Sequence, residues 1–278
     1  INFAHGEIFM AGAFTAYFAA QPMFASGFLN ANPVIGILVI FLVAILTSVT
    51  VAVLLERIAY RPLRRAPRLV PLITAIGASL FLQYTFSGLY GSGVKTYPTI
   101  EVLDGRMSIL GITILKAQAL VIVAAIVLMI ALYLFVQYTK TGKAMRAVAE
   151  DQATATLMGI DVDAIIVRTF MLGAALAGAA GVLYALLNKQ VQFSMGFQPG
   201  LKAFTAAVLG GIGNIPGAML GGLFLGLIES LGPVLVLEGW NIPSANQLKD
   251  AIAFVMLVLV LIFRPTGILG ERLSKKKA

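Results

Sequence analysis

The sequence predicts an all-α protein, a polytopic bundle of transmembrane helices in which some helices are broken or re-entrant. Hydrophobic residues make up 59% of the 278 residues and charged residues only 12%, whereas soluble domains have about 45–50% and about 25%. Uncharged runs long enough to cross a membrane recur along the chain, and one apolar run is interrupted by a cluster of glycine and proline. We expect a single transmembrane domain over residues 1–278.

Runs without charged side chains predict the individual helices. A helix needs about 20 mostly apolar residues to cross the hydrocarbon core of a bilayer. The expected helices are residues 8–20, 34–55, 70–89, 117–138, 169–187 and 251–263.

Basic residues predict the orientation of these helices. Most of the 20 Lys and Arg lie in residues 57–68, 140–168 and 264–277. Because cytoplasmic loops carry an excess of Lys and Arg, we place these three segments in the cytoplasm. Residues 21–33, 90–116 and 237–249 then lie outside. The net charge of +8 is explained by these loops, and we expect no nucleic-acid partner.

Residues 203–237 are too long for one helix across lipid, and glycine and proline break a helix. We predict that residues 203–212 form a half-helix that enters from outside and stops within the membrane, and that residues 218–236 return outward. A bent helix with a glycine-rich packing face is the alternative. Backbone groups freed at that depth must be buried in protein or line a water-filled path, and transporters often place their pathway at such breaks. The residues at the break are Gly210, Gly211, Gly213, Asn214, Pro216 and Gly217.

The polar opening segment, residues 1–7, lies directly against an apolar helix. It contains the single histidine of the chain, His5, together with Asn2 and Glu7. An ionisable group at membrane depth indicates a functional role, but an anion near a helix N-terminus is also favoured by the helix dipole. Structural capping and a direct role in a pathway both remain open. Glu229, near the outer end of its helix, is expected to snorkel to the interface.

Residues 140–168 are too polar to span and too patterned for a plain loop. They predict a short helix that ends at Gly159, a natural C-cap. The helix would carry a charged face and a modest apolar stripe. It would either lie on the lipid headgroups or dock a cytoplasmic partner. The charged face consists of Lys143, Arg146 and Glu150, and the stripe of Met145, Val148 and Ala149.

Several kinds of chemistry are excluded. Without cysteine there is no disulfide or thiolate site. No phosphate-binding Gly-x-x-x-x-Gly-Lys-[Ser/Thr] motif occurs, so the chain does not bind ATP in that way. An intramembrane enzyme would need a nucleophile with its base or a metal cluster, and the sequence offers neither. A secondary transporter or channel would carry further intramembrane ionisable residues. Glu7 and Glu229 are the two candidates in the sequence, so a secondary transporter is kept as the less favoured alternative. We expect no cofactor and no metal.

Four blocks of the sequence form a recognisable set. They are residues 2–7, 56–64, 146–151 with 158–160, and 202–218. Together they resemble the LivH-type permease subunits of bacterial branched-chain amino-acid ABC importers. The resemblance covers almost the whole chain, and the segment at 264–270 also fits. Such subunits normally have an additional N-terminal helix, so we expect one to be missing from this numbering.

The resemblance implies a multi-pass permease of the bacterial inner membrane that imports leucine, isoleucine or valine. Its partners would be a second, LivM-type permease, two cytoplasmic ATPase subunits, a periplasmic binding protein and membrane lipid. Similar permeases carry urea or short amides, and the motifs do not exclude those substrates.

It also implies roles for particular residues. Residues 140–167 match the cytoplasmic coupling region, which favours docking over the interfacial position. The coupling residues would be Arg146, Ala147, Glu150, Asp151, Met158 and Gly159. The residues of the translocation path would be Asn2, His5, Glu7, Gly210, Gly211 and Asn214.

Overall fold

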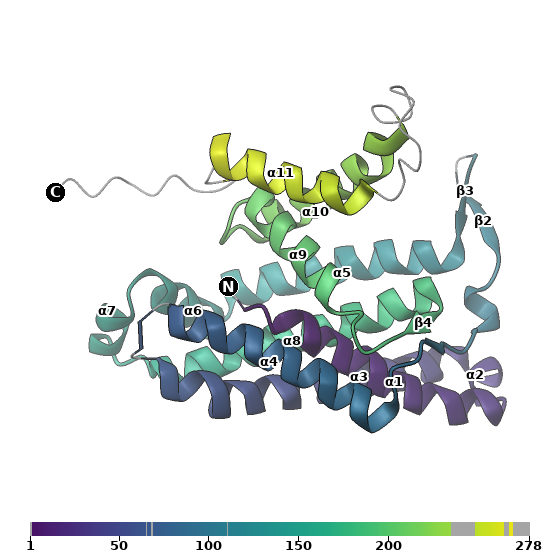
Figure 1. The fold of residues 1–278 in the computed structure, drawn as a ribbon, viewed down its shortest axis with the longest axis horizontal. Helices are drawn as coiled ribbons and strands as arrows, with labels where there is room; N and C mark the ends of the chain where they lie inside the picture. Colours follow the sequence, from purple (N-terminus) through teal and green to yellow (C-terminus); the bar gives the residue numbers. More distant parts are fainter. Residues whose placement is uncertain are drawn as a thin grey trace. The chain divides into compact units, whose positions relative to one another are not determined.

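The computed structural model describes residues 2–64, 66–67, 69–109, 111–234, 248–263 and 267–268. The chain divides into two compact units, Ile1–Gln198 and Pro199–Ala278, and we describe each by itself. Within the described ranges, six helices are long and apolar enough to cross a membrane (Figure 1). The prediction of an all-α polytopic protein is confirmed.

The first unit contains the helices α1 to α8 and two small antiparallel ladders. Strand β1 (Lys95–Thr96) pairs with β4 (Gln190–Val191), and β2 (Arg106–Ile109) pairs with β3 (Ile112–Leu115). The helices are α1 (His5–Ala25), α2 (Phe28–Ala31), α3 (Pro33–Leu55), α4 (Leu69–Tyr90), α5 (Lys116–Tyr138), α6 (Lys140–Glu150), α7 (Gln152–Leu157) and α8 (Val162–Asn188), with a π-helical turn η1 (Glu56–Tyr60) and 3-10 turns η2 (Arg61–Leu63) and η3 (Glu101–Leu103). 

The helices predicted at 34–55, 70–89 and 117–138 are confirmed to within one residue at each end. The helices predicted at 8–20 and 169–187 are longer, as α1 and α8. Helix α8 begins at Val162, where Asp161 Oδ1 accepts the N–H of Ala164 at 3.0 Å. The predicted start, residue 169, lies too late in the chain, because a charged residue ends an apolar run without ending a helix.

Small residues bring α1, α3 and α8 close together to form the centre of the first unit. Ser48 Oγ, on α3, donates to the carbonyl oxygen of Ile8 at 2.9 Å. A Cβ added to Gly178 would lie 2.7 Å from Ser48 Oγ and 2.8 Å from the carbonyl oxygen of Ala44. Helices in lipid associate through such close contacts between small residues.

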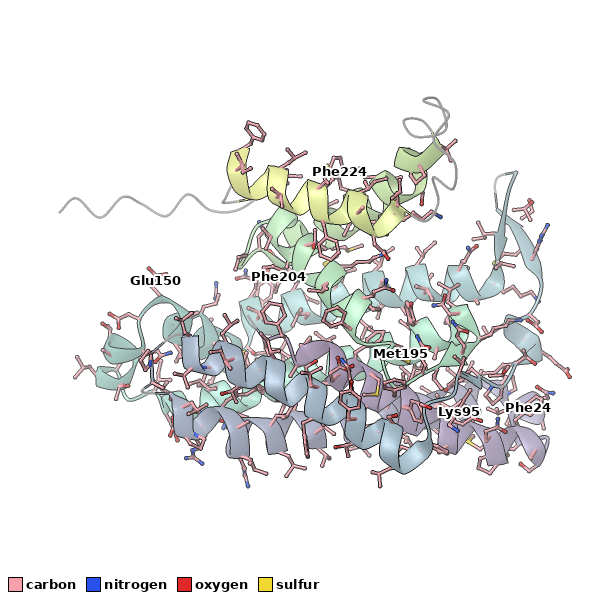
Figure 2. All side chains as sticks on the ribbon, viewed as in Figure 1. Phe24, Lys95, Glu150, Met195, Phe204 and Phe224 are labelled. Carbon is pink, nitrogen blue, oxygen red and sulfur yellow. The ribbon has the colours of Figure 1, made fainter. Side chains whose placement is uncertain are left out.

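The connections of the first unit gather at two opposite ends. At one end, Arg64 pairs with Asp163, which joins the 57–68 connection to the start of α8. At the other, Asn30 Nδ2 donates to Glu101 Oε1 at 2.8 Å. Figure 2 shows Glu150 at the first end and Phe24 at the other. The two basic connections 57–68 and 140–168 therefore share one end, as the predicted topology requires.

The second unit contains most of α9 (Phe197–Gly210), together with α10 (Ile215–Gly232) and α11 (Lys249–Phe263). Helices α9 and α10 form a hairpin, because a Cβ on Gly221 would overlap the carbonyl oxygen of Ala206 and lie 2.7 Å from the nitrogen of Gly210. The predicted break is confirmed, and the bent helix is excluded because the chain reverses direction. The half-helix starts at Phe197 rather than at residue 203.

The break itself spans residues 211–214. Gly211 and Gly213 have φ angles of 108° and 96°, which favour glycine. Asn214 Oδ1 accepts the N–H of Gly217 at 2.8 Å and caps α10. The depth of this break in a membrane stays a prediction. The predicted external loop at 237–249 and the basic tail at 264–277 lie almost entirely outside the described residues.

Lys202 joins the three helices of the second unit. Its Nζ lies 3.2 Å from Glu229 Oε2 on α10 and 2.9 Å from Asp250 Oδ1 on α11. The expectation that Glu229 snorkels to the interface is wrong, since its side chain is only 18% exposed and is paired. The sequence hid this pair because Lys202 precedes the apolar run and reads as part of a loop.

Candidate functional site

Residues 140–159 contain two helices, α6 and α7, where we predicted one. Asp151 between them is extended, with φ −154° and ψ 110°. Its Oδ1 accepts the N–H groups of Ala153 at 2.8 Å and Thr154 at 3.2 Å. Aspartate is a strong N-cap, so it ends α6 and starts α7. The predicted coupling residue Asp151 thus has a structural role of its own.

The end of α5 fixes the position of α6. Gly142 packs so closely against α5 that a Cβ there would overlap the carbonyl oxygens of Phe135 and Val136. Its N–H donates to Thr139 Oγ1 at 3.0 Å, which caps α6. The turn between α5 and α6 is therefore tight, and movement of α6 would reach α5 directly.

The two faces of α6 differ as predicted, with one exception. Val148 is buried in a small cluster with Ala155 of α7 and Ile165 of α8, and Met145 packs against it. Ala149, which we placed on the apolar stripe, is exposed. The charged residues Lys143, Arg146 and Glu150 are all exposed, and Figure 2 shows Glu150 pointing away from the helices.

The segment ends in an exposed apolar pair at a glycine cap. Gly159 has φ 80°, and the N–H of Ile160 donates to the carbonyl oxygen of Ala155 at 3.1 Å, which confirms the C-cap. Leu157 and Met158 are 87% and 78% exposed. Met158 was a predicted coupling residue and Leu157 was not, although it stands beside it in the sequence. We call Arg146, Ala147, Glu150, Asp151, Leu157, Met158 and Gly159 the coupling surface.

The opening segment is held by two other helices. Asn2 Oδ1 accepts the hydroxyl of Tyr60 at 2.6 Å and the N–H of Ala4 at 3.1 Å. Glu7 is fully buried in α1, and its Oε1 accepts Ser79 Oγ at 3.0 Å and Gln83 Nε2 at 2.7 Å. Among the described residues, Glu7 Oε2 has no hydrogen-bond partner.

Glu7 therefore links α1 to α4, which goes beyond capping its own helix. The sequence contained a signal for its partners, because Ser79 and Gln83 are polar residues one turn apart in an uncharged helix. His5 is exposed and faces α8, where a Cβ on Gly173 would lie 3.5 Å from its Cε1.

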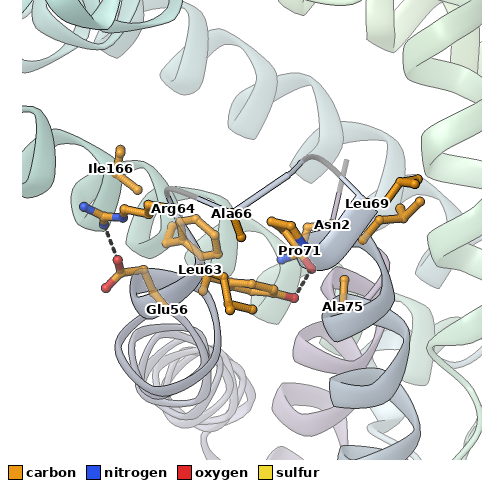
Figure 3. Close-up of a pocket in the computed structure, with 12 residues that line it drawn as sticks. Asn2, Glu56, Leu63, Arg64, Ala66, Leu69, Pro71, Ala75 and Ile166 are labelled. Carbon is orange, nitrogen blue, oxygen red and sulfur yellow. Dashed lines mark hydrogen bonds and ion pairs between the residues drawn. The ribbon is translucent and has the colours of Figure 1, made fainter.

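A cavity of about 930 Å³ opens beside Asn2 (Figure 3). Apolar side chains form most of its wall, and the polar groups are the Asn2 amide, the Tyr60 hydroxyl and the ion pair between Glu56 and Arg64. Glu56 is fully buried. The apolar lining includes Leu63, Leu69, Leu72, Ala75, Ile166 and Phe170.

The other predicted path residues, Gly210, Gly211 and Asn214, lie at the tip of the hairpin in the second unit. A Cβ on Gly210 would overlap the carbonyl oxygen of Gly217, so position 210 has room only for glycine. Across the described ranges, no group of three or more His, Asp or Glu is arranged to hold a metal ion.

Comparison with known proteins identifies the family. The family described as "Branched-chain amino acid transport system / permease component" matches residues 1–261. The chain belongs to this family. This permease is 44% identical to the high-affinity branched-chain amino acid transport system permease protein BraD of Pseudomonas aeruginosa over 274 residues, which are 98% of the chain and 86% of the relative. It is 40% identical to LivH of Escherichia coli over 277 residues, with the same coverage of both.

The permease is also similar to a LivM protein, which carries a different name from the BraD and LivH relatives. A probable branched-chain amino acid transport permease protein LivM of Methanocaldococcus jannaschii is 26% identical over 294 residues, covering 98% of the chain and 79% of the relative. No solved structure matches the chain. The relatives are transport subunits, so this chain is a multi-pass membrane permease and not an enzyme.

Two substitutions of Glu7 distinguish a role in helix packing from a role in transport, when thermal stability and substrate uptake are measured for each. Glu7→Ala removes the acceptor for two buried donors, and each unsatisfied buried group costs about 1–3 kcal/mol. Glu7→Gln keeps an acceptor and loses the charge. We expect Glu7→Ala to lower both thermal stability and uptake, and Glu7→Gln to lower uptake alone. Equal uptake by Glu7→Gln and the unmodified chain would show that the carboxylate only joins α1 to α4.

Proposed function

We propose that this chain is one membrane subunit of an ATP-binding-cassette importer that carries leucine, isoleucine and valine across a bacterial inner membrane. One observation carries the proposal. The chain is 39–44% identical, over 98% of its length, to permease subunits named for high-affinity branched-chain amino-acid transport. A periplasmic binding protein would deliver the substrate.

The partners follow from what the chain has and lacks. Its sequence has no Walker-type phosphate loop, so two separate ATPase subunits would supply the energy. A second, LivM-type permease would complete the membrane part, and the similarity of this chain to a LivM protein fits a pair of homologous subunits.

The coupling surface would bind an ATPase subunit at the cytoplasmic face. Exposed Leu157 and Met158 offer apolar anchors, because burying such side chains against a partner removes apolar surface from water and is favourable. The surrounding charges Arg146 and Glu150 would set the orientation. The buried contacts of Val148 with α8 give the segment a firm connection to the membrane helices.

The path would use alternating access. ATP binding closes the ATPase pair, the coupling surface moves with it, and the helices rearrange around the substrate. Residues 2–7 and 210–217 would line the path. A zwitterionic amino acid presents both charges, and exposed helix ends and backbone groups at broken helices can receive them. The buried carboxylate of Glu7 suits an ammonium group.

Reconstitution with all partners tests the function. We expect proteoliposomes containing both permeases and the ATPase subunits to accumulate labelled leucine when the binding protein is outside and ATP is inside. Unlabelled isoleucine and valine should compete, and urea should not. Competition by urea or acetamide in place of isoleucine would move the substrate to the amide class, and uptake driven by an ion gradient without ATP would contradict the importer class.

A further inference from the structure

Arg64 stands between two carboxylates at the end of the first unit that carries the basic connections. One guanidinium nitrogen pairs with Glu56 Oε1 and the other with Asp163 Oδ1 (Figure 3 shows the pair with Glu56). Glu56 is fully buried, whereas the side chain of Asp163 is 56% exposed. Arg61, on the same turn, reaches only Asp163, at 3.4 Å.

The two carboxylates belong to parts of the chain with different roles. Asp163 lies in the first turn of α8, shortly after the segment of residues 140–159 that contains α6 and α7. We call residues 140–159 the coupling segment. Glu56 opens the π-helical turn that closes α3, and Tyr60, at the end of that turn, holds Asn2 ahead of α1. Arg64 is thus the link that joins the coupling segment to the inner ends of α3 and α1.

The two ion pairs are unequal, and this gives the link a direction. A buried carboxylate left without its cation is strongly destabilising, so Arg64 stays with Glu56. The pair with exposed Asp163 is weak because solvent screens it, so it can break and form within one transport cycle.

We propose that Arg64 is a positioning residue that transmits movement of the coupling segment, through Asp163, to the inner ends of α3 and α1. The proposal rests on the importer function given above. The planar guanidinium of Arg64 carries two sets of N–H donors and holds both carboxylates at once. A lysine ammonium does not do this with the same geometry. Opening and closing of the cavity beside Asn2 would follow the position of Arg64.

Asp163→Asn removes the charge that Arg64 meets on α8 and leaves the ion pair between Arg64 and Glu56 in place. The weakness of an exposed ion pair limits the expected change to about fivefold. We expect the variant complex to assemble and hydrolyse ATP normally while the leucine transported per ATP falls about two- to fivefold, and we expect Asp163→Glu to restore the ratio. Arg61→Gln is the matched control, because it touches the same carboxylate without reaching Glu56, and it should keep a normal ratio.

A second measurement does not depend on the substrate. In this cysteine-free chain, spin labels at Ile58→Cys and Leu69→Cys report on the inner ends of α3 and α4, and both side chains are exposed. We expect ATP to change their distance in the otherwise unmodified complex and not in the Asp163→Asn complex.

Each outcome has one meaning. A normal transport ratio in Asp163→Asn, an ATP-dependent distance change that survives the substitution, or no distance change in the unmodified complex would overturn the link. Loss of ATPase binding in Asp163→Asn would also overturn it, since the residue would then belong to the docking contact. An ATP-dependent distance change that Asp163→Asn abolishes, found together with no leucine uptake by the unmodified complex, would leave the link supported and the proposed substrate wrong.

Discussion

Replacing Leu157 and Met158 with glutamate is expected to release the ATPase subunits from the permease. These side chains are 87% and 78% exposed, so we expect the substitutions not to disturb the fold of this chain. Fully burying a leucine or methionine side chain against a partner contributes about 2 kcal/mol, which corresponds to about 30-fold in affinity per residue. We expect co-purification of the ATPase to be lost in the double variant and weakened in each single one.

Val102→Glu is the matched control for this experiment. Val102 is also an exposed aliphatic side chain, but it lies in η3 at the opposite end of the first unit. Glu150→Lys is a cleaner charge variant than Asp151→Lys, because Asp151 caps α7. Two results together would show that α6 and α7 lie on the headgroups and that the docking assignment is wrong. In the first, the complex with the double variant keeps its ATPase subunits. In the second, an isolated α6–α7 peptide with the same two substitutions loses its affinity for vesicles in a flotation assay.

Gly178→Leu is expected to prevent the close packing of α1, α3 and α8. Even the first side-chain carbon would lie 2.7 Å from Ser48 Oγ and 2.8 Å from the carbonyl oxygen of Ala44, and a backbone oxygen does not rotate away. Overpacking of a well-packed core costs about 1–3 kcal/mol and sometimes more. We expect the loss to be about 3 kcal/mol and the melting temperature in detergent to fall by about 5–10 °C.

Gly77→Leu is its control, because Gly77 is also a mid-helix glycine and no atom lies within 4 Å of a Cβ added there. Its melting temperature should be unchanged or slightly higher, since leucine favours helix more than glycine does. Equal melting temperatures for the two leucine variants would contradict the close contact of α8 with α3.

The membrane helices could be predicted from sequence because lipid imposes a simple rule. Every backbone group in the hydrocarbon core must be satisfied within a helix or by protein, so an uncharged run such as residues 34–55 has one available structure. The start of α8 and the start of α9 were misplaced for the converse reason. Charged residues such as Asp163 and Lys202 are compatible with helix, and their charge carries no information on where the helix begins.

The candidate site was harder to predict because its residues act through partners far away in the sequence. Glu7 was recognised as an unusual carboxylate, but its partners Ser79 and Gln83 lie more than 70 residues later. Residues 140–159 were read as one helix because their helical periodicity continues through Asp151, whose capping contacts are local and need no change in pattern. The glycine break near residue 210 was found because it is local.

Thiol labelling of single cysteines in this cysteine-free chain tests most directly whether the coupling surface faces the side where ATP is hydrolysed. Thr156→Cys lies in α7 and Val102→Cys at the opposite end of the first unit, and both positions are exposed. In intact cells, a membrane-impermeant maleimide should label Val102→Cys, and it should label Thr156→Cys only after the inner membrane is permeabilised. Labelling of Thr156→Cys in intact cells would place the coupling surface outside and contradict the account.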